Sequence, residues 1–412
     1  MASRPPAAAD PTPALVGEVW RAEAPHVLAA LLRRYGDLGD CEDAAQEAAA
    51  AAAEQWPRDG LPDQPRGWLI RVASRRLIDR VRSDRARADR ELSVGTARPA
   101  DAEFAPGADA ERFGDADDTL RLFLLCCHPS LSRSSQVALT LHAMAGLTTE
   151  QVAAAYLVPP RTMTQRLTRA RATLRQAGAR FELPAPEQLP ARIAAVLDAC
   201  HLMFTEGHTR SGGESLTDTT LTAEAIRLTR KLHAALPDHD EVAGALALML
   251  ITEARAAART DAAGDLVPLE RQDRGLWDRE LIREGVAILD RVLPRGPIGR
   301  YQLSAAIAAV QTEAPTAEDV DWLEISMLYG MLERVAPGPA VTLNRAVAVG
   351  MALGPDQGLA IIDELLSEPA MRRHHRAHAV RAHLLERAGD LAAAAEAYHQ
   401  AAPLTTSLPE QR

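Results

Sequence analysis

Apolar residues recur at the three- and four-residue spacing of an α-helix along nearly the whole chain, which restricts its fold more than any other feature. From residue 12 to about residue 90, the pattern breaks only where Gly, Pro and Asp cluster, in YGDLGD and WPRDGLPDQP. It resumes at residues 119–175 and again beyond residue 191. Helix-favouring alanine is abundant, whereas aromatic residues make up only 4% of the chain. We therefore predict an all-α protein, with roughly four helices before residue 90.

Two segments without helical periodicity divide the chain. Residues 101–118 hold seven acidic residues against one arginine, which is typical of a flexible linker. FELPAPEQLP holds three prolines in ten residues and forms a second boundary. The predicted organisation is a disordered N-terminus (1–11), a helical domain (12–92), an acidic flexible linker (93–118), a second helical domain (119–180), a Pro-rich linker (181–190) and a helical C-terminal extension (191–412).

Several classes of protein are disfavoured by what the sequence lacks. The four cysteines, Cys41, Cys126, Cys127 and Cys200, form no C-x-x-C pair and have no histidine at metal-ligand spacing, so we expect neither disulfides nor zinc. No apolar run reaches the roughly 20 residues of a membrane span, and the N-terminus lacks the apolar core of a signal peptide. No phosphate-binding glycine loop, nucleophile motif or zinc-protease motif is present. We expect a cytoplasmic protein without membrane contact, enzymatic activity, catalytic residues, metal or cofactor.

The clearest binding motif lies in residues 146–175, GLTTEQVAAAYLVPPRTMTQRLTRARATLR. Thr148 or Thr149 can cap a short helix, LVPP makes a turn, and Pro160 suits the start of a second helix. On the second helix, one apolar face is formed by Met163, Leu167, Ala170 and Leu174. Residues 161–175 carry five arginines and no acid although the whole chain has a net charge of -10. This arrangement predicts a DNA-binding helix-turn-helix, the alternative being a solvated arginine-rich face.

A second basic helix precedes this motif. Residues 66–90 carry nine arginines and three aspartates. Its apolar residues are spaced for a buried face: Trp68, Leu69, Val72, Leu77, Ile78 and Val81. Just upstream, DCEDAAQEAAAAAAEQW gathers polar residues on about a turn and a half of helix: Asp40, Asp43, Gln46 and Glu47. An acidic face beside a basic one suits a protein that contacts another protein and DNA together.

These motifs occur in an order that is found in one protein family. An E-D-x-x-Q-E motif with a distal tryptophan is matched by Glu42, Asp43, Gln46, Glu47 and Trp56. QPRGWL leads into the basic helix in the manner of an N-P-x-x-W-L sequence. A T-x-x-x-R-L-x-R-A pattern is matched by Thr162, Arg166, Leu167, Arg169 and Ala170. The first 175 or so residues therefore resemble the extracytoplasmic-function (ECF) group of bacterial sigma-70-family initiation factors, the two helical domains corresponding to regions 2 and 4.

The resemblance implies partners and site residues. It implies that Asp40, Asp43, Gln46 and Glu47 dock on the beta-prime clamp helices of core RNA polymerase, and that region 4 touches the beta flap. Promoter DNA would be read at the minus-ten element by Arg71, Arg75, Arg76, Asp79, Arg80 and Arg82, and at the minus-thirty-five element by Arg161, Thr162, Thr164, Gln165, Arg166, Arg169 and Arg171. The implied function is promoter recognition in transcription initiation. The alternative is a helix-turn-helix regulator with a ligand- or protein-binding domain, which does not require the acidic helix.

The C-terminal extension ends in a pattern that resembles a tetratricopeptide repeat. In AHAVRAHLLERAGDLAAAAEAYHQAA the key residues are Ala382, Gly389, Asp390, Ala394, Tyr398 and Ala401. Small residues would let two antiparallel helices approach, Gly-Asp would make the turn, and the tyrosine would fill the groove between them. Upstream, HLMFTEGHTRSGG resembles the extension of one ECF subgroup. We expect this extension to regulate the factor from within the same chain, by contact with the sigma-like domains.

Two histidine groups in the extension do not have the spacing of metal ligands. His201, Glu206 and His208 do not share one helix face, and a helix end that turns into a Gly-Ser loop explains them more simply. The histidines of RRHHRAH are better explained as a solvated cationic helix face: His374, His375 and His378. The expectation of no metal site extends to both groups.

Overall fold

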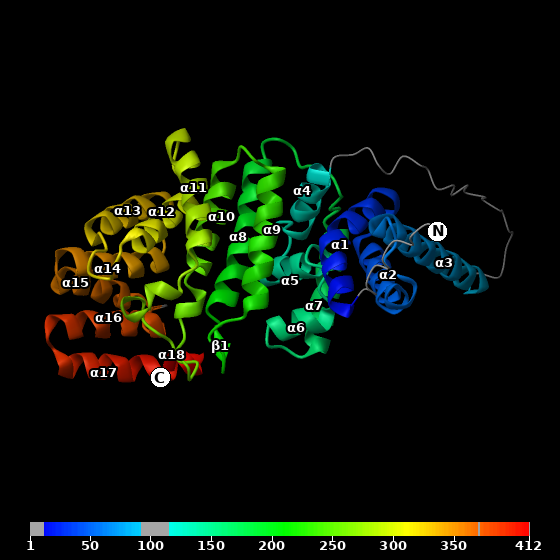
Figure 1. The fold of residues 1–412 in the computed structure, drawn as a ribbon. Helices are drawn as coiled ribbons and strands as arrows, with labels where there is room; N and C mark the ends of the chain where they lie inside the picture. The colour runs from blue at the N-terminus through cyan, green and yellow to red at the C-terminus, as the bar shows by residue number, and fades with distance from the viewer. Residues whose placement is uncertain (1–11, 92–114, 370, 412) are drawn as a thin grey trace, which may run out of the picture. The chain divides into compact units, whose positions relative to one another are not determined.

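The computed structural model describes residues 12–91, 115–369 and 371–411, which are predominantly helical (Figure 1). The strands β1 (Gly212–Gly213) and β2 (Thr406–Ser407) form a parallel pair of two residues each. The prediction of an all-α protein is confirmed. The predicted N-terminal segment 1–11 and residues 93–114 of the predicted acidic linker lie outside the described residues. The chain divides into two compact units, Met1–Ala199 and Cys200–Arg412.

The first unit begins with three helices rather than the four we expected. They are α1 (Pro13–Tyr35), α2 (Leu38–Asp59) and α3 (Pro65–Glu91). Gly36 and Gly60 end the first two at positive φ values of 80° and 85°, which glycine adopts readily. The Asp37 side chain accepts a hydrogen bond from the Asp40 backbone N–H at 3.0 Å and caps α2. These two breaks are the ones that the sequence shows, and nothing interrupts the helical pattern elsewhere in residues 13–91.

Alanines form the buried face of α2. Ala44, Ala48 and Ala52 are fully buried, and their small side chains let the neighbouring helices α1 and α3 lie close to the α2 backbone. Trp56 supplies bulk at the end of this face, where its ring lies edge-on to Trp68 with centroids 5.4 Å apart. The packing leaves Asp40, Asp43 and Glu47 of α2 exposed, whereas Glu42 is buried.

Four shorter helices follow in the first unit: α4 (Asp115–Cys126), α5 (Arg133–Ala143), α6 (Thr149–Ala155) and α7 (Pro160–Gln176). Because α4 begins at Asp115, the predicted linker was extended too far at its C-terminal end. Thr148 and Gln151 form a capping box at the start of α6, with hydrogen bonds of 2.9 and 3.3 Å. The buried face predicted for the second helix of the motif is confirmed in α7: Met163, Leu167, Ala170 and Leu174.

Helix α8 (Leu189–His208) runs across the boundary between the two units. Its first part belongs to the first unit, where Asp198 pairs with Arg133 and the Arg192 guanidinium donates to the Leu124 carbonyl. Its last part belongs to the second unit, where the His201 ring lies edge-on to Tyr301 at 5.4 Å. The helix begins two residues before the predicted start of the extension.

The second unit is a series of helices in which chain neighbours pack against one another (Figure 1). They are α9 (Thr219–Ala235), α10 (Asp240–Glu253), α11 (Arg279–Val292), α12 (Arg300–Glu313), α13 (Trp322–Val335), α14 (Pro339–Leu353), α15 (Pro355–Ser367), α16 (His375–Ala388), α17 (Leu391–Ala401) and α18 (Leu408–Gln411). Short 3-10 turns include η1 (Ala256–Ala258) and η3 (Arg274–Leu276), which contact each other. The pair α16–α17 is a helical hairpin at the predicted position, and α14–α15 form a second hairpin before it.

The last hairpin follows the predicted small-residue pattern, except at its tyrosine. Gly389 is left-handed, with φ 86°, and Asp390 caps α17 by accepting from the Ala393 N–H at 3.0 Å. Ala382 and Ala394 are buried where the helices meet. Tyr398 is 42% exposed and its hydroxyl lies 3.4 Å from a Glu386 carboxylate oxygen, so the prediction that it fills the groove was wrong.

Candidate functional site

The acidic residues singled out from the sequence share one exposed face of α2. The side chains of Asp40, Asp43 and Glu47 are 58%, 50% and 44% exposed, as a docking surface requires. Partial burial and the carboxylates of Asp37 and Asp43 raise the pKa of Asp40 above its ordinary value, against the opposing attraction of cations nearby. The face is therefore a concentrated negative surface.

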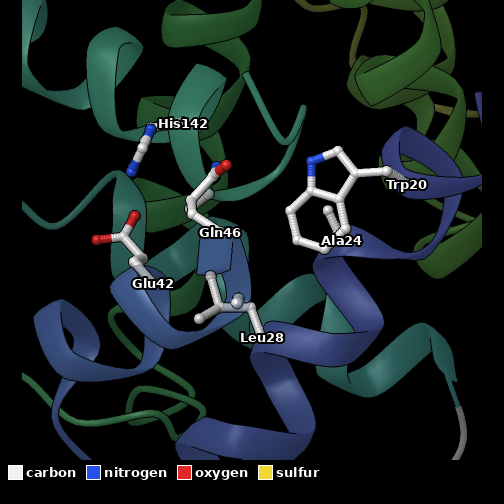
Figure 2. Close-up of a pocket in the computed structure, with 8 residues that line it drawn as sticks. Trp20, Ala24, Leu28, Glu42, Gln46 and His142 are labelled. Atoms are coloured by element: carbon white, nitrogen blue, oxygen red, sulfur yellow. The ribbon is translucent and has the colours of Figure 1, made fainter. Parts of the chain in front are cut away.

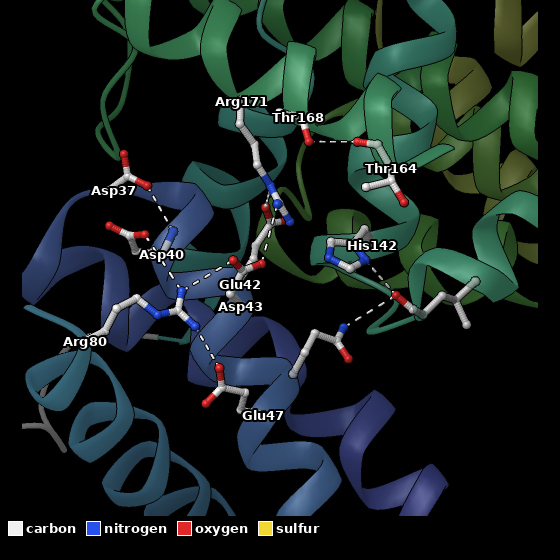
Figure 3. Close-up of polar contacts among 12 residues, drawn as sticks. Asp37, Asp40, Glu42, Asp43, Glu47, Arg80, His142, Thr164, Thr168 and Arg171 are labelled. Atoms are coloured by element: carbon white, nitrogen blue, oxygen red, sulfur yellow. Dashed lines mark hydrogen bonds and ion pairs between the residues drawn. The ribbon is translucent and has the colours of Figure 1, made fainter. Parts of the chain in front are cut away.

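Arg80 of α3 lies over this acidic face and contacts all three carboxylates (Figure 3). Its Nη2 is 2.7 Å from Glu47 Oε1, and its Nη1 is 3.4 Å from Asp43 Oδ2 and 3.9 Å from Asp40 Oδ1. Arg76 adds a longer contact, with its Nε 3.7 Å from Glu47 Oε2. Two residues predicted to read the minus-ten element are thus paired with the residues predicted to bind polymerase.

A second arginine reaches the same helix from the helix-turn-helix. Arg171 of α7 donates from Nε to Glu42 Oε2 at 2.7 Å, and its Nη1 lies 3.5 Å from Asp43 Oδ1 (Figure 3). The side chain of Glu42 is 2% exposed and that of Arg171 is 16% exposed, so this ion pair is largely shielded from water. Arg175 makes an outer contact, with its Nε 3.4 Å from Asp37 Oδ2. A residue predicted to contact the minus-thirty-five element is therefore engaged by α2 instead.

Uncharged contacts extend the interface between α1, α2 and the helix-turn-helix. The Trp20 indole N–H donates to the Gly146 carbonyl at 2.8 Å in a buried position. Gly146 has a φ of 66°, and a Cβ there would lie 2.8 Å from the Trp20 Nε1 atom, so both the backbone and the close approach require glycine. The Leu147 carbonyl accepts from His142 Nδ1 at 2.8 Å, with Gln46 Nε2 at 3.5 Å (Figure 3).

A small cavity lies beside these contacts (Figure 2). It is lined by Trp20, Ala24, Leu28, Glu42, Ala45, Gln46, His142 and Ala143. One carboxylate oxygen of Glu42, Oε1, is buried without a hydrogen-bond partner in the described residues. The cavity is part of the interface between the two helical groups of the first unit.

Sequence reasoning missed several residues that hold this interface. Trp20 and His142 belong to no motif identified in the sequence, and Glu42 was identified only as part of the E-D-x-x-Q-E motif. Asp118 fell in the predicted linker, yet it is 4% exposed and forms ion pairs with Arg33 and Arg121. The run of acids before the second domain carried no signal that one of them would be buried.

The helix-turn-helix keeps an exposed polar face on α7. The exposed residues among those predicted to contact the minus-thirty-five element are Arg161, Thr162, Thr164, Gln165 and Arg169. The Thr164 hydroxyl donates to the Pro160 carbonyl at 3.0 Å and is turned towards its own helix. Arg166 is half-buried, with its guanidinium 5.1 Å from the centre of the Tyr156 ring. Arg161, Gln165 and Arg169 are therefore the long side chains best presented to a groove.

Helix α3 also keeps a solvent-facing basic surface. The exposed residues of the predicted minus-ten set are Arg71, Arg75, Arg76, Asp79 and Arg82. Arg80 is the member that turns towards α2, and its side chain is 32% exposed. The helix thus presents several arginines to solvent, while Arg80, with a longer contact from Arg76, binds the acidic face.

The histidine groups of the extension do not converge on one point. His208 is stacked on Phe204 at 5.5 Å, whereas Glu206 accepts from the backbone and hydroxyl of Ser211 at 3.0 Å. Burial, followed by the charges of Arg259 and Arg255, lowers the pKa of His208 to about 2. Among the described residues, no three His, Cys, Asp or Glu side chains are placed to hold a metal. No described helix has the length and apolar composition of a membrane span.

Three protein-family models match this chain. The model for sigma-70 region 2 matches residues 19–87, and the model for sigma-70 region 4 matches residues 123–174. A family of unknown function, DUF6596, matches residues 192–293. The first two matches fall on α1–α3 and on α4–α7, the two helical groups whose contacts are described above.

Curated relatives agree with this assignment. An uncharacterized protein of Rhizobium meliloti (strain 1021) is 39% identical over 388 residues, which cover 94% of this chain and 91% of the relative. The probable ECF RNA polymerase sigma factor SigI of Mycobacterium tuberculosis is 30% identical over 186 residues, 45% of this chain and 62% of that protein. No solved structure gives a significant match. The chain therefore belongs to the sigma-70 family of transcription initiation factors, with ECF-type regions 2 and 4 followed by a C-terminal extension that contains the DUF6596 domain.

Proposed function

We propose that this protein is a sigma factor that docks on core RNA polymerase through the acidic face of α2 and reads promoter DNA with α3 and α7. The clamp helices of the beta-prime subunit and the beta flap are the proposed contacts on the polymerase. The minus-ten and minus-thirty-five elements are the proposed DNA targets. The polymerase supplies the catalytic chemistry, and the sigma factor supplies position and specificity.

The observation that carries this proposal is the shared ion-pair network of Asp40, Asp43 and Glu47 with Arg80 and Arg171. It supports a cationic partner for the acidic face, because exposed carboxylates at this density attract guanidinium groups within a few ångströms. It also supports an anionic partner for the basic helices, since the same arginines already bind carboxylates. A cationic surface on polymerase would take the place of the arginines on the acidic face. The phosphates of DNA would take the place of the carboxylates on the arginines.

Docking on this view is an exchange of partners. In the described structure, Arg80 and Arg171 occupy the acidic face, so polymerase must displace them to bind Asp43 and Glu47. The displaced arginines then become available to DNA. We propose that this exchange couples polymerase binding to the exposure of the promoter-reading surface.

The test is the affinity of the full chain for purified core polymerase. Reversing charge with Asp43→Lys and Glu47→Lys should weaken binding at least tenfold, because two docking carboxylates become repulsive. Glu54→Lys is the matched control, since Glu54 is exposed on the same helix outside the network. Equal affinity of a well-folded double variant would rule out docking through this face.

The same experiment separates the proposal from its alternative. A helix-turn-helix regulator with a ligand-binding extension would bind an operator without any affinity for core polymerase. A full chain that binds specific DNA alone and never binds core would therefore support that reading.

We further propose that the extension regulates the factor from within the chain by contacting regions 2 and 4. Residues 191–412 make up more than half of the protein, whereas the sigma domains already contain both DNA-binding helices. Helical hairpins such as α14–α15 and α16–α17 are common protein-binding scaffolds.

A further inference from the structure

A bend in the second unit holds two buried side-chain N–H donors that have no acceptor in the described residues. Arg255 follows the end of α10, and Trp277 follows η3. The two residues flank one backbone hydrogen bond, in which the Asp278 N–H donates to the Ala254 carbonyl at 2.8 Å. Trp277 is 3% exposed and packs in a buried cluster with Ala254. The bend is therefore well packed, and its polar groups are held in place.

The side-chain donors in this bend are not satisfied. Arg255 Nε and Trp277 Nε1 are both buried, and neither has a hydrogen-bond partner in the described residues. In that part of the chain, the Arg255 side chain makes no hydrogen bond or ion pair, and only the backbone of this residue is bonded, to Thr252 and Ala258. An N–H group held away from water without an acceptor is unfavourable, because it loses its hydration and gains no hydrogen bond in return.

Neighbouring cations increase the local positive charge. The Arg274 guanidinium lies 4.4 Å from the centre of the Trp277 ring, and its Nη1 donates to the Gln311 and Ala314 carbonyls at 2.9 and 2.8 Å. Arg259 is 8% exposed and donates to the His208 carbonyl and to Thr209 Oγ1. Both of these arginines use neutral oxygen atoms, so their charges are not cancelled by these contacts.

The pKa values reflect this crowding. Burial, followed by the charge of Arg274, lowers the pKa of Arg255 to about 10. Burial and the charge of Arg255 lower the pKa of Arg259 to about 10, although Glu253 and Glu410 oppose the shift. Glu253 accepts from Thr222 at 3.0 Å, and Glu410 pairs with Arg376 at 3.0 Å. Neither carboxylate is a partner of Arg255.

We infer that Arg255 and Trp277 form a binding site for an oxyanion group, a phosphate or a carboxylate, carried by a small ligand. The planar guanidinium suits two oxygen atoms of one group, and the indole N–H can donate to the same group. Arg255 is only partly buried as a whole residue, so a ligand can approach it from solvent. This inference rests on the second unit alone and does not depend on the proposed role of the sigma domains.

The test is calorimetric titration of the full chain with inorganic phosphate and, separately, with acetate, in an otherwise weakly binding buffer. We expect saturable binding of at least one probe. Arg255→Met should weaken that binding at least tenfold, and Trp277→Phe should weaken it several-fold while keeping the ring. Arg283→Met is the control, because the Arg283 side chain is 75% exposed on nearby α11. Phosphate binding alone would identify a phosphorylated ligand, and acetate binding alone a carboxylic acid.

Thermal unfolding, with and without the same anions, gives a second readout that does not depend on the heat of binding. Without added anion, Arg255→Met should unfold at a temperature no lower than the wild-type chain, because the variant removes an uncompensated charge. Added phosphate or acetate should raise the midpoint of the wild type and not that of the variant. The inference is overturned if neither probe binds, if Arg255→Met binds like the wild type, or if the variant is destabilised without anion.

Discussion

Glu42 shows how one buried residue can hold two domains of a sigma factor together. Its neighbours Asp43 and Glu47 are exposed and exchangeable, whereas Glu42 lies at the inner edge of α2 with Arg171 as its partner. A buried ion pair contributes little net stability, but the loss of one partner leaves the other charge uncompensated. The pair therefore specifies how α2 and α7 contact each other and adds little to the net free energy of folding.

A double-mutant cycle tests the energetic coupling between Glu42 and Arg171. Arg171→Ala should destabilise the first unit by about 3 kcal/mol, because Glu42 then remains buried without its cation. Adding Glu42→Gln should recover more than half of that loss, since the stranded charge is gone. The change in unfolding free energy of each variant is measured by urea unfolding of the full chain, monitored by tryptophan fluorescence. Arg175→Ala should cost less than about 1 kcal/mol, because its contact is exposed; a cost equal to that of Arg171→Ala would contradict the assignment.

At the scale of elements, the two ends of α7 have different surroundings. Its N-terminal half presents Arg161 and Gln165 to solvent, whereas Arg171 and Arg175 near its C-terminus contact α2. A recognition helix inserts its N-terminal residues into the major groove, so the half proposed to read bases is exposed in the described structure. Substitutions in the N-terminal half can therefore test DNA binding without changing the contacts with α2.

Promoter selectivity should therefore change in different ways along α7. Gln165→Ala should cost about 1 to 3 kcal/mol at one base position of the upstream element and little elsewhere, because a base-edge contact is lost. Arg169→Ala should weaken binding to all sequences alike, as the loss of a phosphate contact does. The slope of log affinity against log salt concentration should become smaller by about one. Holoenzyme binding to promoters with single-base substitutions, at several salt concentrations, separates the two. A uniform loss for Gln165→Ala would exclude base reading by that residue.

For the whole molecule, α8 determines where the extension can be removed. A chain that stops near Leu183 lacks Arg192 and Asp198, which make contacts in the first unit. A chain that stops after Thr209 keeps the helix intact. This second design tests the extension without removing part of the sigma half.

Removal of the extension after Thr209 should change the rate of run-off transcription with purified core polymerase. An extension that covers DNA-binding surfaces predicts a faster rate, and one that supports the sigma domains predicts a slower rate. The comparison requires matched folded concentrations and a range of salt, since exposed charge contacts weaken as salt rises. Equal rates throughout would exclude regulation within the chain and would point to a separate partner.

Local features of this fold were predictable from the sequence, whereas contacts between distant segments were not. The buried face of α7 and the caps of α6 and α17 follow from residues a few positions apart. The Glu42–Arg171 pair joins residues 129 positions apart. From its position on a basic helix, Arg171 was predicted to contact DNA and not a carboxylate. Arg255 belongs to no motif, and only its buried Nε, which has no hydrogen-bond partner in the described residues, marks it as unusual.

The pairing of α2 with its two arginines has a consequence for how the factor searches a genome. Free DNA attracts proteins mainly through the release of condensed counterions by exposed cations. Carboxylates that occupy Arg80 and Arg171 act as built-in counterions, and the chain as a whole is negatively charged. If docking is the exchange of partners proposed above, a factor in this state should release fewer ions on meeting random DNA and should stay there only briefly. Its attraction to DNA should then rise once polymerase has taken the place of the two arginines.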